Sequence, residues 1–295
     1  MAHLHSQNHT SYNRAFAIGI ILNIVFVAVE IIYGLISNSS ALLADAGHNA
    51  SDVLGLVFAW TASWLATIRP RGKYTYGLRK TTVLVAILNA FLLFAAVIAI
   101  GWDSYNKIKD PQAVAGEQVM IVAGIGVVIN TLTALLFFKG QKHDLNIRGA
   151  FLHMAADAAV SLGVVLAGFL INVTGLFWID SLMSFIIIAV ILYGTWGLFS
   201  DSVNLALDAV PKNIDIDKVR QFIESQAGVE NLHDLHIWAM STTQAALTAH
   251  LVMPAGNDDK FISELKSELK ERFNIGHTTF QIERRNLEKE CGNNC

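Results

Sequence analysis

Two segments of this 295-residue chain place a histidine and an aspartate four residues apart within otherwise apolar sequence: His48 with Asp52, and His153 with Asp157. Residues i and i+4 share one face of a helix, so each pair points two potential metal ligands in the same direction. Two such pairs facing each other supply two nitrogens and two oxygens, enough for a tetrahedral zinc site. Because ionisable groups are costly inside a membrane, a duplicated pair predicts a metal site rather than incidental polarity.

The composition is that of a membrane protein. Hydrophobic residues make up 53% of the chain and charged residues only 15%, and the mean hydropathy is +0.45, whereas an ordinary soluble domain carries about a quarter charged residues. The apolar residues run almost without a break through 13–205, and much of the charge lies in 210–290. The apolar runs predict a lipid bilayer as partner. The formal net charge of −3 indicates no partner, and without a basic tract we expect no nucleic acid.

Six apolar segments are long enough to cross a membrane, which takes about 20 residues as a helix. The loops that follow the second and the fourth segment are rich in Lys and Arg, so the positive-inside rule places them in the cytoplasm. An even number of spans then puts both termini there as well. We therefore expect a multi-pass protein of the bacterial inner (cell) membrane. The predicted spans are 13–36, 41–67, 79–106, 115–139, 147–173 and 177–205.

Beyond Pro211 the pattern changes to that of a small α+β domain. Helical and strand-like patterns follow in the order α-β-β-α-β, which is typical of an appended ferredoxin-like domain. A domain of about 75 residues is small for a self-sufficient core, which favours pairing with a second copy. The expected elements are helix 215–227, strands 231–241 and 244–253, helix 257–273 and strand 277–284. The chain then divides into a tail (1–12), a six-helix membrane domain (13–208), a cytoplasmic domain (209–285) and a second tail (286–295).

The two His-x-x-x-Asp pairs also predict a mechanism. Two carboxylates close together in a low dielectric favour proton uptake when no metal is bound, whereas zinc needs neutral imidazoles and ionised carboxylates and therefore expels protons. If the two forms open to opposite sides, the result is metal/proton antiport, with His48 and His153 as proton carriers because imidazole titrates near neutral pH. The ligand set favours zinc, and next cobalt, iron(II) or manganese. Asp45, on the same face as His48, either orients a ligand, relays protons or is polar packing.

Four stretches together resemble the cation diffusion facilitators, a family of zinc/proton antiporters: Leu42–Asp52, His153–Asp157, Tyr76-Gly77 and His233–Trp238. The resemblance implies a homodimer with six spanning helices and a metallochaperone-like cytoplasmic domain, which exports Zn²⁺ from the cytoplasm in exchange for protons by alternating access. It places His48, Asp52, His153 and Asp157 each on a position of the family's transport site. The His₂Asp₂ set is similar to that of zinc-selective members, whereas members with Asp at the position of His48 also carry cadmium.

The resemblance bears on two further features near the membrane. Lys80 and Asp208 match a charged pair that locks the dimer in some members; the alternatives are a positive-inside anchor and a solvated charge at a helix end. Some bacterial members carry an additional Asp/His metal site in the loop after the second span. Here residues 71–78 of that loop contain neither an imidazole nor a carboxylate, so we expect that second site to be absent.

The cytoplasmic domain offers a separate candidate site. His233, His250 and Glu283 match the family's cytoplasmic zinc positions, and the two histidines lie on neighbouring strands of one hairpin, where a turn near Ser241 sets them roughly opposite. His277 shares a strand face with Glu283, but six residues of strand span about 20 Å, so the two cannot bind one ion. The trio predicts a Zn²⁺ with a structural or regulatory role; solvated surface imidazoles are the alternative.

Both tails carry residue types that bind metals. The C-terminal tail contains Cys291 and Cys295, and the N-terminal tail contains His3, His5 and His9. Animal members of the family use an N-terminal His motif and a C-terminal Cys pair to bind zinc, which makes the two cysteines candidate ligands. Their Cys-x-x-x-Cys spacing is wider than the family's Cys-x-x-Cys, and free thiols in a reducing cytoplasm are the alternative.

Two other functions use the same residues. A membrane-embedded zinc hydrolase needs an open metal position and a general base such as that of a His-Glu-x-x-His motif, and the chain shows neither. A membrane-anchored metal sensor would read metal with its cytoplasmic domain, but six spans with four buried ligands exceed what an anchor needs. The sequence therefore favours a secondary transporter of divalent metal over an enzyme.

Overall fold

The computed structural model describes residues 9–138, 145–256 and 259–285. The chain forms two compact units. The first combines Met1–Val57 with Asn89–Trp196, and the second combines Phe58–Leu88 with Gly197–Cys295. The second, third and sixth long helices contribute residues to both units.

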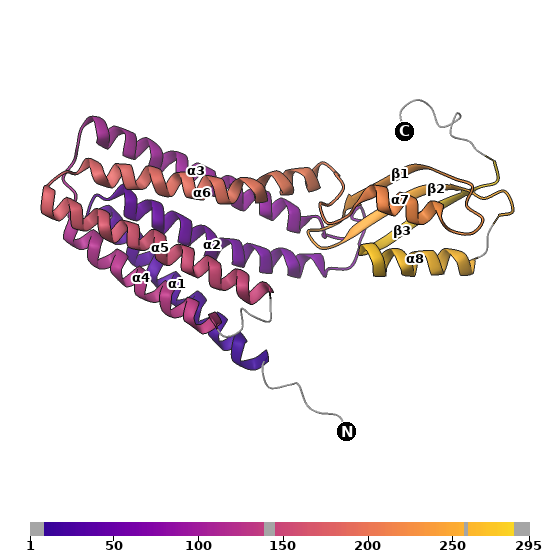
Figure 1. The fold of residues 1–295 in the computed structure, drawn as a ribbon, viewed down its shortest axis with the longest axis horizontal. Coiled ribbons are helices and arrows are strands. Elements are labelled where there is room, and N and C mark those ends of the chain that lie inside the picture. The colour runs from indigo at the N-terminus through magenta and orange to yellow at the C-terminus, as the bar shows by residue number, and fades with distance from the viewer. Residues whose placement is uncertain (1–8, 139–144, 257–258, 286–295) are drawn as a thin grey trace, which may run out of the picture. The chain divides into compact units, whose positions relative to one another are not determined.

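Six long helices run through the chain as far as residue 206 (Figure 1). They contain between 23 and 30 residues, and at 1.5 Å per residue they are about 35–45 Å long, more than the ~30 Å hydrocarbon core of a bilayer. Their ends lie within four residues of the predicted spans: α1 His9–Ile36, α2 Ser40–Ala66, α3 Thr81–Lys109, α4 Gly116–Phe138, α5 Leu145–Thr174 and α6 Trp178–Ala206.

The helices differ in how clearly their length and hydropathy identify them as membrane spans. Among the described residues, four stretches are long and apolar enough to cross a bilayer: Thr81–Lys109, Gly116–Leu136, Phe151–Thr174 and Trp178–Ala206. A further apolar stretch in α1, Asn23–Ile36, is shorter. α2 is not among these stretches, and four polar residues interrupt its apolar sequence: Asp45, His48, Asn49 and Asp52. The helix with the first His-x-x-x-Asp pair is thus the least apolar of the six.

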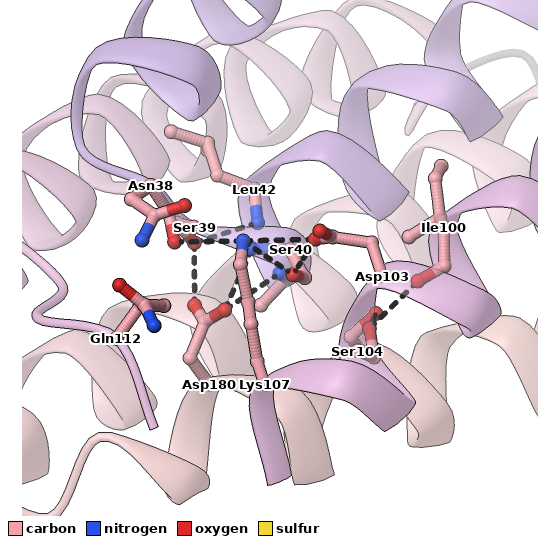
Figure 2. Close-up of polar contacts among 12 residues, drawn as sticks. Asn38, Ser39, Ser40, Leu42, Ile100, Asp103, Ser104, Lys107, Gln112 and Asp180 are labelled. Atoms are coloured by element: carbon pink, nitrogen blue, oxygen red, sulfur yellow. Dashed lines mark hydrogen bonds and ion pairs between the residues drawn. The ribbon is translucent and has the colours of Figure 1, made fainter. Parts of the chain in front are cut away.

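The start of α2 is held by a carboxylate from another helix, as Figure 2 shows. Ser39 caps the helix, because its Oγ accepts a hydrogen bond from the backbone N–H of Leu42 at 3.0 Å. Asp180, in the first turn of α6, accepts hydrogen bonds from Ser39 Oγ at 2.5 Å and from the backbone N–H groups of Ser40 at 2.6 Å and Ala41 at 3.3 Å. A carboxylate in this position satisfies the free N–H groups of the helix and complements its dipole, so Asp180 ties α2 to α6.

Lys107 of α3 balances the charge of this cluster (Figure 2). Its Nζ donates hydrogen bonds to the carbonyl oxygen of Asn38 at 3.1 Å and to Oγ of Ser40 at 2.9 Å, and it lies 2.8 Å from a carboxylate oxygen of Asp103. Ser40 Oγ in turn donates to Asp103 at 2.5 Å. These contacts join α2, α3 and α6, and Ser40 lies eight residues before His48. We call the residues that make them the α2 clasp: Asn38–Ser40, Asp103, Lys107 and Asp180.

α4 and α5 lie side by side (Figure 1), so close that their backbones touch. A Cβ on Gly168 of α5 would lie 2.9 Å from the carbonyl oxygen of Gly116 and 2.9 Å from the backbone nitrogen of Met120. A Cβ on Gly116 would lie 2.7 Å from the carbonyl oxygen of Gly168. Only glycine fits such a crossing, which is a common way for membrane helices to pack. The crossing fixes α5, the helix that carries His153 and Asp157.

The second unit contains a three-stranded sheet with two helices. Its elements are α7 Ile216–Glu224, β1 Asn231–Ala239, β2 Ala245–Val252, α8 Asp259–Phe273 and β3 Ile275–Glu283. The strand order is β1-β2-β3; β1 and β2 pair antiparallel, while β2 and β3 pair parallel with α8 as the crossover. Buried side chains of both helices, among them Ile223 and Leu269, pack with the strands into a core. The observed order α-β-β-α-β is the predicted one.

The five elements of this unit differ from their predicted bounds by up to three residues, and for α7 and β3 the structure shows the reason. α7 ends at Glu224 rather than at residue 227, because Ser225 forms its C-cap and Gly228, with φ of +86°, turns the chain toward β1. β3 begins at Ile275 rather than at residue 277, since Ile275 is buried and pairs with Ala245. A register shift directly after this pair breaks the alternation from which the strand start was predicted.

Gly168→Ala is expected to destabilise the full-length protein, because its methyl group would meet backbone atoms that cannot rotate away; overpacking of this kind costs about 1–3 kcal/mol. Gly124→Ala on α4 is the matched control. Nothing lies within 4 Å of a Cβ at Gly124, and alanine is favoured over glycine in a helix by about 1 kcal/mol. Thermal unfolding in detergent would compare the variants, and equal midpoints for the two would contradict the close crossing.

Candidate metal centres

The structure brings together the four residues of the two His-x-x-x-Asp pairs, here called the membrane quartet: His48 and Asp52 of α2, His153 and Asp157 of α5. His48 Nε2 lies 3.2 Å from Asp157 Oδ1 and 3.9 Å from Asp52 Oδ2. His153 Nε2 lies 3.1 Å from Asp52 Oδ2 and 3.7 Å from Asp157 Oδ2. Each histidine is therefore closer to the carboxylate of the other helix than to that of its own.

The spacing of the quartet suits one small cation. One donor atom each of His48, Asp52 and Asp157 lie within 4.8 Å of one another, and a tetrahedral zinc ion draws its donors to about 3.3–3.5 Å. His153 is outside that group of three, although its Nε2 lies within 3.7 Å of both carboxylates. Among the described residues, Oδ2 of Asp52 accepts no hydrogen bond, so a lone pair remains for a cation.

Burial and charge vary across the quartet. The side chain of Asp157 is 2% exposed, whereas those of Asp52 and His153 are 32% and 43% exposed. With neutral imidazoles the four groups carry two negative charges, and leaving them uncompensated in a low dielectric costs several kcal/mol. A divalent cation, or protons, would neutralise them.

Asp45 lies outside the quartet. It is fully buried, and its Oδ2 accepts a hydrogen bond from Ser161 Oγ of α5 at 3.0 Å. Its partner is therefore a hydroxyl of the neighbouring helix rather than one of the four candidate ligands.

In the cytoplasmic domain, His233, His250 and Glu283 also meet, here called the cytoplasmic trio. His233 and His250 are direct partners across β1 and β2, as expected for the hairpin, and Glu283 follows at the end of β3. Glu283 Oε2 lies 3.0 Å from His233 Nε2, and its Oε1 lies 3.0 Å from His250 Nδ1. Donor atoms of all three lie within 4.8 Å of one another, and His233 and Glu283 are buried.

A β-bulge adds a fourth residue that the sequence did not indicate. The β1–β2 register shifts between His233 and His236, and Asp234 within the bulge has φ of +51°. Its Oδ2 lies 3.3 Å from His250 Nε2 and its Oδ1 lies 2.7 Å from His236 Nε2. His250 thus presents Nδ1 to Glu283 and Nε2 to a carboxylate, an arrangement typical of metal-ligating histidines. Strict alternation places Asp234 on the face opposite His233, and only the bulge overrides it.

The remaining candidates lie apart from both centres. His277 is exposed and its ring contacts that of Tyr76 edge to face, with centroids 5.5 Å apart, so it is not part of the trio. Lys80 and Asp208 form an ion pair within one chain, Nζ to Oδ1 at 2.5 Å, with both side chains about half exposed. The candidate tail ligands lie outside the described residues: His3, His5, Cys291 and Cys295.

Comparison with known proteins agrees with this two-part organisation. Residues 16–205 match the cation efflux transmembrane domain, and residues 211–285 match the cytoplasmic domain of cation efflux proteins. The chain belongs to the cation efflux family. This cation efflux protein is therefore a multi-pass membrane transporter, as predicted, and not an enzyme.

Curated relatives match nearly the whole of this cation efflux protein. It is 34% identical to the metal cation efflux system protein CzcD of Cupriavidus metallidurans, over 95% of this chain and 89% of the relative. It is 32% identical to the cadmium, cobalt and zinc/H(+)-K(+) antiporter of Bacillus subtilis, over 95% of this chain and 91% of that protein. It is 31% identical to the zinc transporter ZitB of Escherichia coli, over 96% of this chain and 93% of that protein.

Asp234→Ala is expected to weaken zinc binding at the cytoplasmic trio by about 10–100-fold, because the carboxylate orients His250. His236→Ala is the matched control, since His236 contacts Asp234 but offers no atom to the trio, and its affinity should stay near that of the unaltered protein. Chelator competition on full-length protein that also carries Asp157→Asn would report the trio with the membrane quartet disabled. An unchanged affinity in the Asp234→Ala protein would rule out the orienting role.

Proposed function

We propose that this protein exports Zn²⁺ from the cytoplasm in exchange for protons, with His48, Asp52, His153 and Asp157 as the transport site. The observation that carries the proposal is the crossed arrangement of the membrane quartet, in which the closest partner of each imidazole is a carboxylate of the other helix. Any ligand of this site therefore bonds α2 to α5. A change of ligand changes how firmly the two helices are held together, which is what alternating access requires.

The contacts also favour exchange with protons. Without a metal, an N–H at Nε2 of His48 can donate to Asp157, and an N–H at Nε2 of His153 faces Asp52. Zinc would bond the same nitrogen atoms through their lone pairs, so the hydrogen at Nε2 must leave first. Protons and Zn²⁺ thus compete for the same atoms. Export follows when the zinc-loaded and the protonated forms open to opposite sides.

Zinc is the best match to the donor set, which combines two imidazoles with two carboxylates and contains no thiolate. The two relatives that support this choice are the E. coli protein, named a zinc transporter, and the B. subtilis protein, named a cadmium, cobalt and zinc antiporter. The name of the second also supports proton exchange. Family members with Asp at the position of His48 also carry cadmium, so a histidine there supports the zinc-selective His₂Asp₂ type.

The architecture that we propose has six membrane-spanning helices, with α1 and α2 added to the four clearest spans. Both termini lie in the cytoplasm of a bacterial cell, whose inner membrane holds the protein. The membrane domain comprises residues 13–208, and residues 209–285 form a ferredoxin-like domain. Two copies form a homodimer, in which the Lys80–Asp208 ion pair stabilises the contact between copies. The basic loops support the orientation, and the small α-β-β-α-β core supports the pairing.

The cytoplasmic trio fits a resident zinc ion of structural or regulatory role. Two imidazoles and one carboxylate, with His233 and Glu283 buried, supply three of the four donors of a tetrahedral site. Nδ1 of His250 is buried and makes no hydrogen bond among the described residues, which leaves it available as a ligand. When bound, the ion would join β1, β2 and β3 at one edge of the domain.

Asp157→Asn is expected to reduce proton-driven zinc flux to the level of protein-free liposomes, because the amide cannot supply the buried negative charge that binds Zn²⁺. Asp110→Asn is the matched control: Asp110 is an exposed carboxylate of the α3–α4 loop, and its loss should leave flux unchanged. Proteoliposomes with a set pH gradient and a zinc-sensitive dye inside would measure both. Normal flux through the Asp157→Asn protein would remove the quartet from the transport path.

A further inference from the structure

A pair of fully buried carboxyl groups lies beside the membrane quartet, and the proposed function does not use it. Glu30 belongs to α1 and Asp45 to α2, and both side chains are 0% exposed. Glu30 interrupts an apolar run on its helix in the same way as His48 does on α2. Asn49, one turn after Asp45 on the same face of α2, donates a hydrogen bond to Glu30, which places the two carboxyl groups near each other.

Each carboxyl group has one satisfied oxygen and one that faces no donor. Glu30 Oε2 accepts a hydrogen bond from Asn49 Nδ2 at 3.0 Å, and Asp45 Oδ2 accepts one from Ser161 Oγ at 3.0 Å. Glu30 Oε1 and Asp45 Oδ1 have no such donor within the described part of the chain. Two ionised carboxylates cannot hydrogen-bond to each other, because neither carries a hydrogen. One proton shared by the pair would give these two oxygens a hydrogen bond and remove one of the two buried charges.

No cationic side chain in the described parts of α1, α2 and α4 offers an alternative to that proton, and Arg148 of α5 is exposed and lies more than three turns before Ser161. Residues 23–36 of α1 contain no Lys or Arg, and neither does α2 or α4. The nearby charged candidates belong to the membrane quartet: Ser161, the hydrogen-bond partner of Asp45, lies one turn after Asp157 on α5, and His48 lies one turn after Asp45 on α2. The charged residue that α4 contributes, Glu117, is exposed in its first turn. Two like charges so close in a low dielectric cannot both persist.

We infer that Glu30 and Asp45 hold one proton between them and release it when Zn²⁺ binds at the membrane quartet. This inference rests on the proposed zinc/proton exchange and adds a second proton site to it. A cation among His48 and Asp157 cancels the negative charge that opposes ionisation of the pair. The O–H bond of the shared carboxylic acid then breaks, the proton passes to solvent, and a second carboxylate remains. When zinc leaves, the charge of Asp157 returns and the pair takes up a proton again.

The test counts protons released per zinc bound to the full-length protein in weakly buffered detergent solution, with a pH indicator. Glu30→Gln and Asp45→Asn are each expected to bind as much zinc as the unaltered protein but to release about one proton fewer per chain. Glu117→Gln, the same change at an exposed carboxyl, is the matched control and should release the full number. Protons released by zinc binding at the cytoplasmic trio should be equal in number for the unaltered protein and all three variants.

The outcomes separate this inference from the proposed function. If the unaltered protein releases no protons on binding zinc, the exchange itself fails. If it does, but Glu30→Gln and Asp45→Asn release the same number, only the carboxyl pair is excluded. Loss of one bound zinc ion in either variant would make the pair a metal site and overturn the inference.

Infrared difference spectra of the unaltered protein supply a second measurement that does not depend on how the variants fold. The band of a buried protonated carboxyl group should disappear when zinc binds, and its persistence would contradict the release step.

Discussion

The cost of burying charge in a low dielectric governs how the membrane unit is built. Two of its buried carboxylates meet a compensating group: Asp180 meets the N-terminus of α2, and Asp157 meets the imidazole of His48. In the α2 clasp the compensation is permanent, because backbone N–H groups cannot leave. In the membrane quartet it is exchangeable, because a cation and protons can occupy the same lone pairs. This difference separates a polar cluster that fixes a helix from one suited to transport.

The two candidate metal centres differ in scaffold. The membrane quartet joins side chains of two helices, whose separation can change with a small tilt, and two of its members, His153 and Asp52, are 43% and 32% exposed. The cytoplasmic trio is set by strand pairing, which holds His233 opposite His250, and a carboxylate in the bulge orients one imidazole. Strand register leaves little freedom of movement. The first arrangement suits an ion that must be released, and the second suits one that stays.

Much of this arrangement could be predicted because it depends on local periodicity. Apolar segments predicted the six long helices, and the i,i+4 spacing predicted which face carries His48 with Asp52. The hairpin pattern likewise predicted that His233 and His250 face each other. Asp234 was missed because a bulge reverses its side, and Glu30 was missed because a single acidic residue in a helix carries no periodic signal. The contacts of both depend on neighbours distant in the sequence.

The sequence by itself determined which residue types line one face of α2 and of α5, because the helical repeat places residues four apart in register. It also determined the membrane character of the chain, since hydropathy is a sum over neighbouring residues. Only the tertiary structure decided that each imidazole lies nearest the carboxylate of the opposite helix, and that Asp180 closes the start of α2. These contacts depend on how closely helices approach, and such an approach is decided between segments far apart in the chain, as the α4–α5 crossing at Gly168 illustrates.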